Sequence, residues 1–178
     1  MDDRSLWEMA EIFPSRLGTL SALLDKGAAF AEAQGVAFET LAQAQLAPDM
    51  FPLNRQVSIA CRFAWETVSL LSGRERPSVQ PIGESLNELK ARIAETIGKI
   101  EGVGEPEFKG AATRRVLVQL QGDREAEFSG AEFLRDWTLP NFYFHVTTAY
   151  DILRHKGVLL GKADFMAYAA PHIRQKAG

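Results

Sequence analysis

The stretch that decides the fold is residues 129–157, which reads SGAEFLRDWTLPNFYFHVTTAYDILRHKG. It opens on Ser129 and has Glu132 three residues later, a spacing typical of a capping box at a helix start. It closes with the cationic residues 154–156, which suit the negative end of a helix dipole. The stretch therefore predicts one long helix. Pro140 lacks a backbone N–H, so it forces this helix to kink or to restart.

Three further stretches place apolar residues at steps of three and four, the spacing of one helix face. They cover residues 13–31, 57–71 and 86–100. Before the fourth stretch the pattern changes to alternation over 116–120, followed by a Gly122-Asp123 turn, which is typical of a short hairpin. The sequence thus predicts an all-α four-helix bundle with a short β-hairpin between helices three and four.

The composition fits one folded domain over residues 1–178, with 46% hydrophobic and 24% charged residues. Twenty Lys and Arg face 23 Asp and Glu, a net charge of −3. With no cluster of basic residues along the chain, nucleic-acid binding is not expected. The longest charge-free stretch late in the chain, between Asp136 and Asp151, falls short of the ~20 residues of a membrane span. The acidic N-terminus has no signal-peptide pattern, so we expect a cytoplasmic protein without a membrane partner.

The three histidines decide whether a metal site is possible, because a catalytic metal needs about three protein ligands. His145 and His155 share the last predicted helix, which would separate them by ~15 Å along its axis. His172 follows Pro171 in the tail, and nothing in the sequence directs it toward the others. The spacing therefore predicts no metal ligands and no cofactor. The single cysteine, Cys61, lies on the apolar stripe of the second helix and is expected to be buried.

His145 is the leading candidate for a functional side chain. On a helix it shares one face with Asn141, Thr148 and Ala149, and that face also carries Ile152, so it points inward. A histidine in such a place is either a metal- or substrate-binding group or a hydrogen-bonded core residue. The residues alone leave these alternatives open.

Several strings are distinctive when taken together. They are LLDK at 23–26 with Ala28-Ala29, LAPDMFPL at 46–53 with Gln56, and LPNFYFHVTTAY at 139–150 with LRHKGV at 153–158 and GKAD at 161–164. Over nearly the whole chain they resemble the domain-of-unknown-function family nineteen-ninety-three, a branch of the DinB/YfiT-like bundle superfamily. The resemblance implies a four-helix bundle that commonly forms a homodimer. It implies no established reaction.

The wider superfamily includes metal-dependent enzymes, some of them thiol transferases. The resemblance implies a metal held by one His early in the second helix and by a late His-x-x-x-His pair. Here His145 matches the first member of that pair, Ala149 stands at the partner position, and the second-helix position falls on or near Gln56. One ligand of three matches, which instead suggests a metal-free polar cluster of Gln56, Asn141 and His145.

We therefore expect a metal-free small-ligand-binding or interaction module with a pocket between the second and fourth helices. The expected polar contacts are Gln56, Asn141, His145, Thr148 and Tyr150, and the expected apolar walls are Phe51, Phe63, Trp137, Phe142 and Phe144. The alternative is an enzyme. It would be a divergent DinB-type metal-dependent thiol transferase or hydrolase-like protein, or a metal-free enzyme with His145 as general base. A purely structural dimer is the third possibility.

Overall fold

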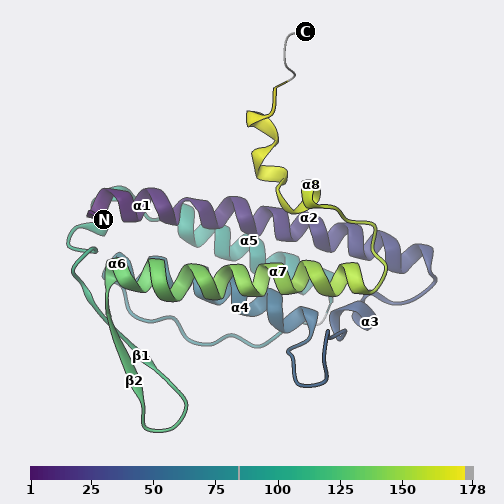
Figure 1. Cartoon of the computed structure of the whole chain (residues 1–178), viewed down its shortest axis with the longest axis horizontal. Coiled ribbons are helices and arrows are strands. Elements are labelled where there is room, and N and C mark those ends of the chain that lie inside the picture. The colour runs from purple at the N-terminus through teal and green to yellow at the C-terminus, as the bar shows by residue number, and fades with distance from the viewer. Residues whose placement is uncertain (84, 175–178) are drawn as a thin grey trace.

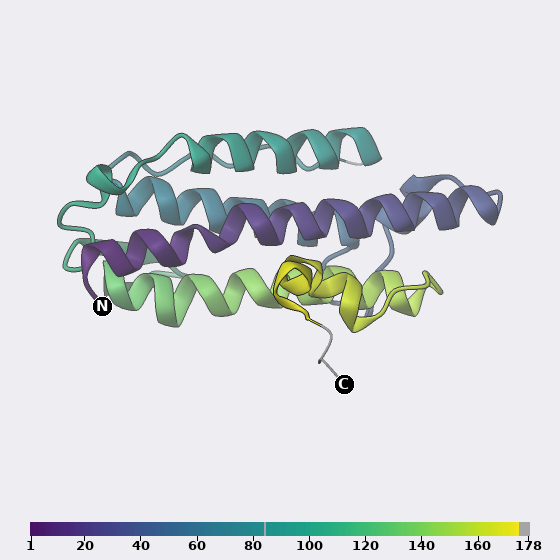
Figure 2. The ribbon, with the colours of Figure 1, turned by 90° about the horizontal axis from the view of Figure 1, so that it is seen from above.

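A computed structural model describes residues 1–83 and 85–174 of the chain; residues 84 and 175–178 of the predicted domain lie outside the described residues. Four long helices lie with their axes roughly aligned (Figures 1 and 2). They are α2 (Ile12–Ala33), α4 (Leu53–Leu71), α5 (Leu86–Glu101) and α7 (Leu139–His155). The predicted helical bundle with a hairpin insertion before its last helix is confirmed.

Shorter elements complete the fold. They are α1 (Asp3–Ala10), α3 (Phe38–Ala42), the 3-10 helix η1 (Glu105–Phe108), α6 (Gly130–Glu132), the π-helix η2 (Phe133–Thr138), α8 (Lys162–Phe165) and the 3-10 helix η3 (Ala167–His172). The last two lie on α2, above it in Figure 1. Lys26 of α2 holds Asp164 of α8 through an ion pair of 2.5 Å. No helix among the described residues is long and apolar enough to cross a membrane.

The apolar stripes of the four long helices form the core. Phe13, Leu17, Leu20 and Leu24 of α2 are fully buried, as is Phe142 of α7. The rings of Phe13 and Phe142 meet edge to face, with 4.9 Å between their centroids. Each such side chain contributes roughly 1.5–3 kcal/mol of hydrophobic free energy on burial. The sum of these contacts holds the two helices together.

The fourth stretch folds as the sequence predicted at its start and at its proline. Ser129 and Glu132 form the capping box, with the Ser129 N–H donating to Glu132 Oε2 at 2.8 Å. The chain then widens into the π-helix η2 and restarts as α7, with Pro140 in the first turn. There the missing N–H breaks no interior helix bond. The restart also leaves a carbonyl at Trp137, which accepts a hydrogen bond from Asn141 Nδ2 at 2.7 Å.

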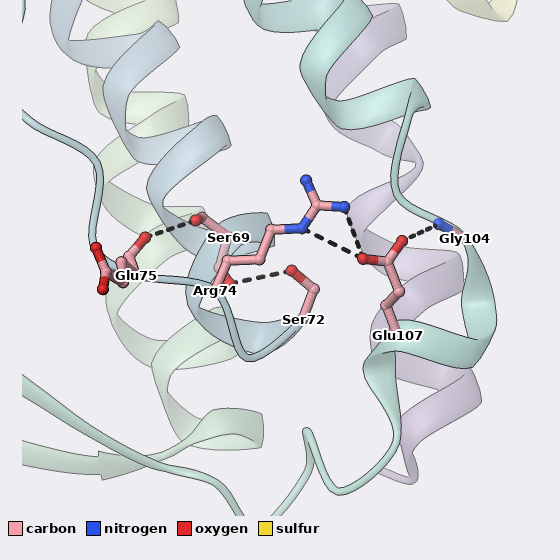
Figure 3. Close-up of polar contacts among 6 residues, drawn as sticks. All are labelled: Ser69, Ser72, Arg74, Glu75, Gly104 and Glu107. Atoms are coloured by element: carbon pink, nitrogen blue, oxygen red, sulfur yellow. Dashed lines mark hydrogen bonds and ion pairs between the residues drawn. The ribbon is translucent and has the colours of Figure 1, made fainter.

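Helices α4 and α5 run in the same direction, because their C-terminal ends lie together. Arg74, just after α4, donates to Glu107 Oε2 just after α5, at 2.6 Å from Nη2 and 3.2 Å from Nε (Figure 3). Glu107 in turn accepts from the Gly104 N–H at 3.1 Å. Two parallel neighbours need a connection that returns along the bundle. The chain after Gly73 makes this return over residues 74–83, which form no helix or strand.

The predicted hairpin is present and projects away from the bundle (Figure 1). Strands β1 (Arg115–Gln119) and β2 (Glu125–Ser129) pair antiparallel, with Val116 opposite Phe128. Val116 and Val118 pack against Phe133 at the start of η2. This contact supplies the apolar burial that an isolated two-stranded hairpin lacks in water.

Candidate functional site

His145 and Gln56 are brought together across the interface of α4 and α7. His145 Nδ1 lies 2.6 Å from Gln56 Oε1, and Gln56 Nε2 donates to the Phe51 carbonyl at 2.9 Å. Gln56 is 1% exposed and His145 9% exposed. The pair was one of the contacts expected from the sequence, and it couples α7 to the start of α4.

The hydrogen bonds determine which nitrogen of His145 carries the proton. Because the amide group of Gln56 donates to Phe51, its Oε1 atom must face His145 as an acceptor. Nδ1 of His145 is therefore the donor, and the neutral ring leaves a lone pair on Nε2. Nε2 makes no hydrogen bond to the described residues and is not among their fully buried atoms that lack a partner, so it is not completely buried. His145 thus keeps one acceptor that no described residue occupies.

The surroundings of His145 keep the ring neutral. The Phe63 ring stacks on it at 5.9 Å between centroids and 19° between planes, and Phe144 meets it edge-on at 5.3 Å. Burial and, to a lesser extent, the positive charge of Arg62 together lower the pKa of His145 to about 4. At neutral pH the imidazole is uncharged and a weak base.

The remaining predicted polar residues do not join this pair. Asn141 donates to Trp137 and Thr148 donates to Phe144 at 2.7 Å, each to a carbonyl of the same helical run. Tyr150 packs its ring edge-on against Phe165 of α8, 5.5 Å between centroids. Of the five expected polar contacts, the structure brings Gln56 and His145 into one cluster.

The expected apolar walls are also divided among several places. Phe142 is fully buried in the core, and Trp137 packs against Phe128 of the hairpin. Phe63 stays with His145, whereas Phe144 is 56% exposed and Phe51 is 41% exposed. These two exposed aromatic residues adjoin the His145–Gln56 pair, Phe144 through its ring and Phe51 through its carbonyl.

The metal site that the family resemblance implies, with three His ligands, does not fit these residues. The described part of the chain holds no group of three His, Cys, Asp or Glu side chains that could bind a metal ion. Gln56 already uses both ends of its amide, one on His145 and one on Phe51. Ala149 is fully buried and has no donor atom. His145 alone offers a free nitrogen, which is fewer than the about three protein ligands of a catalytic metal.

Cys61 is buried, as the sequence predicted, and burial raises the pKa of its thiol to about 12. It lines a cavity of about 310 Å³ between α4 and α5, closed on a third side by residues 77–82. This cavity lies on a different face of α4 from His145. Sequence reasoning missed it, although Arg55, Ile59 and Arg62 already share one helix face at steps of four and three.

Comparison with known proteins gives a family match and structural matches. The family described as Domain of unknown function (DUF1993) matches residues 8–166. The crystal structure of a DinB family member protein from Shewanella denitrificans is 37% identical, with a TM-score of 0.86. That match covers 99% of this chain and 97% of the other. No functionally curated protein matches the chain.

Proposed function

This chain belongs to the family described as Domain of unknown function (DUF1993), and from that premise we propose that it is a metal-free, single-domain binding protein whose His145 receives a small ligand. The observation that carries the proposal is the Gln56–His145 hydrogen bond, which commits Nδ1 as a donor and leaves Nε2 as an acceptor that is not completely buried. A ligand with an O–H or N–H donor satisfies that atom, and the rings of Phe63 and Phe144 supply flat apolar surfaces beside it.

The weak basicity of the His145 ring favours a binding role over general-base catalysis. A general base works best with a pKa near the operating pH, and burial holds the pKa of His145 at about 4. Such an imidazole accepts a hydrogen bond at neutral pH but removes protons poorly. This supports a recognition role for His145.

The proposal includes a cytoplasmic location and a homodimer, both of which we expect from the sequence. The cytoplasmic part is compatible with the described residues, which hold no helix long and apolar enough to cross a membrane. The homodimer rests on the family resemblance and is compatible with exposed Phe144 and Phe51 beside His145. Cell fractionation with an antibody to the chain tests the location.

The ligand proposal is tested with phenol and anisole as a matched pair of probes. Phenol carries one O–H donor, and anisole has the same ring with the donor methylated. Two-dimensional NMR of the histidine rings should show a saturable shift of His145 with phenol that is at least tenfold weaker with anisole. His145→Gln should abolish the phenol response, and His155→Gln at the exposed end of α7 should retain it. Equal binding of the two probes, or binding unchanged in His145→Gln, would overturn the proposal.

The metal-dependent alternative is tested by elemental analysis. The protein is incubated with zinc or nickel and then desalted. We expect less than about a tenth of an equivalent of metal per chain, because the residues offer one of about three needed ligands. One equivalent that disappears in His145→Ala would instead establish the metal-dependent alternative.

A further inference from the structure

The cavity lies between two helices, α4 and α5, that run in the same direction. Parallel α4 and α5 are joined by a chain that returns along them, and residues 77–82 of that return form the third wall. The Arg74–Glu107 contact in Figure 3 fixes the point where the return begins. Nearby, Ser69 Oγ donates to the Glu75 carbonyl at 2.8 Å and holds the chain to the end of α4. The volume, about 310 Å³, lies at the lower end of the range of small-molecule sites.

Several walls of this cavity carry large apolar side chains, and some of these are open to solvent. Val79 is 78% exposed, and Ile82 and Phe51 also lie partly open to solvent. Ile59 and Trp65 of α4 also line the cavity. Large apolar side chains gathered around one concave surface are typical of a ligand site, whereas single exposed ones need no explanation.

The charged groups of the cavity are mostly cations without carboxylate partners. Its charged lining residues are Arg55, Arg62, Arg92, Lys99 and Glu95, and Glu95 is already paired with Lys99 at 2.5 Å. The guanidinium groups of Arg55 and Arg62 contact aromatic rings, those of Phe51 and Phe63 at 3.8 and 5.1 Å from the centroids. Neither makes an ion pair within the described part of the chain. Burial and the neighbouring Arg55 both lower the pKa of Arg62.

Arg92 supplies a second and independent observation. Its Nη2 donates to the Pro81 carbonyl of the third wall, but its Nε atom is fully buried and has no hydrogen-bond partner. A buried donor without an acceptor is unfavourable, and most such groups in proteins are paired. The guanidinium of Arg92, which lines the cavity, therefore keeps a donor without an acceptor.

We propose that the α4–α5 cavity binds a small amphipathic anion, with an apolar body against Ile59, Trp65 and Val79 and a carboxylate or phosphate head on Arg62 and Arg92. The guanidinium fork matches both kinds of head group in bidentate geometry. The head neutralises the cation pair of Arg55 and Arg62 and accepts hydrogen bonds from the guanidinium of Arg92. This site goes beyond the proposed ligand at His145, from which it is separated around α4: Phe63 faces His145, and Arg62 faces the cavity.

The test uses octanoate, octyl phosphate and octanol, which share one apolar body and differ in the head. Calorimetry should show saturable binding of one molecule per chain for at least one of the two anions. Octanol should bind at least tenfold more weakly, because a charge-assisted hydrogen bond is worth about a factor of ten or more. The tighter of the two anions identifies the head group as carboxylate or phosphate. No saturable binding of either anion, or equal binding of octanol, would overturn the proposal.

Substitutions of lining residues then test whether the anion binds in this cavity. Arg62→Gln and Arg92→Gln should each weaken binding of the anion at least tenfold and leave the weak binding of octanol unchanged. Arg62 lies at the surface and only its guanidinium is partly covered, so Arg62→Gln is expected to fold as the parent does. Arg124→Gln in the hairpin turn removes the same charge far from the cavity and should bind as the parent does. Anion affinity unchanged in both cavity variants, or lost equally in Arg124→Gln, would contradict the placement.

The two proposed sites can be told apart by the same set of proteins. His145→Gln should leave anion binding within a factor of two of the parent, since His145 does not line the cavity. Arg92→Gln should leave the phenol response of His145 in place. Failure of the phenol experiment with success of the anion experiment would therefore overturn the proposed function and retain this inference.

Discussion

The neutral state of His145 links the stability of the protein to pH. In the unfolded chain its pKa is near the ordinary value of 6.5, whereas in the folded protein burial and Arg62 hold it at about 4. Below pH 6.5 the unfolded chain therefore takes up a proton that the folded protein does not accept until about pH 4. The free energy of unfolding must then fall as the pH decreases through this window.

We expect this contribution to reach about 1 kcal/mol between pH 7.5 and pH 5.0, after allowance for solvent screening of the partly open ring. Urea denaturation at the two pH values measures it. His145→Gln cannot titrate, so the difference between its two unfolding energies should be smaller by this amount. His155→Gln serves as the control and should keep the full difference. A pH dependence that is the same in His145→Gln and in the parent would contradict the neutral, buried ring.

Single residues also show which contacts between side chains could be predicted from the sequence. Gln56 and His145 were expected together because the family resemblance aligned both with a superfamily ligand position, and they are hydrogen-bonded. Asn141 and Thr148 were expected beside them from their spacing alone. Their side chains instead bond to carbonyls four residues earlier, a local option that Ser, Thr and Asn always have and that spacing does not reveal.

At the scale of elements, Asn141 closes the junction between the π-helix η2 and α7. We expect Asn141→Ala to lower the free energy of unfolding by about 1 kcal/mol, because the Trp137 carbonyl loses its donor. The same variant should leave the pKa of His145 and its phenol response unchanged. Denaturation and an NMR titration measure the two effects. A shift in the His145 pKa would return Asn141 to the ligand site where the sequence placed it.

Gly130 starts α6 at a point where two backbones touch. A Cβ atom there would lie 2.0 Å from the Ala111 carbonyl oxygen and 2.8 Å from Leu71 Cδ2. Because a backbone carbonyl cannot move aside easily, Gly130→Ala should lower the free energy of unfolding by about 2 kcal/mol or more.

The matched control for Gly130 is Gly98 on the exposed side of α5, where an added Cβ meets nothing within 4 Å. Gly98→Ala should raise the free energy of unfolding by roughly 0.5–1 kcal/mol, since alanine favours the helix over glycine. Thermal or urea denaturation of both variants decides the comparison. Equal effects of the two substitutions would show that the contact with Ala111 is unimportant.

The elements themselves were largely predictable, and the reason is local. Capping boxes at Ser85 and Ser129, the proline restart and the alternating hairpin each depend on residues within a few positions of one another. The cavity was not predictable in the same way. Its cations come from two helices, as Arg55 and Arg62 on one and Arg92 and Lys99 on the other, so no basic cluster is visible along the chain.

In the whole molecule, the proposed homodimer requires an apolar surface of one chain that the second chain covers. Phe144 is 56% exposed beside His145, which makes it the first residue to test. Light scattering should give a mass near twice 19.7 kDa for the parent, and Phe144→Ser should shift the population toward the single-chain mass. Leu159→Ser is the control, since Leu159 is 87% exposed after α7 and should leave the dimer unchanged. A parent protein with the mass of one chain would refute the dimer.

The return segment between α4 and α5 has a consequence for how such a bundle can diversify. Residues 77–82 form a wall of the cavity but belong to no helix, and connections of this kind accept insertions and deletions at little thermodynamic cost. Relatives can therefore lengthen or shorten this wall, or change its side chains, while the four helices keep their packing. Ligand selectivity at the cavity is free to evolve separately from the stability of the bundle.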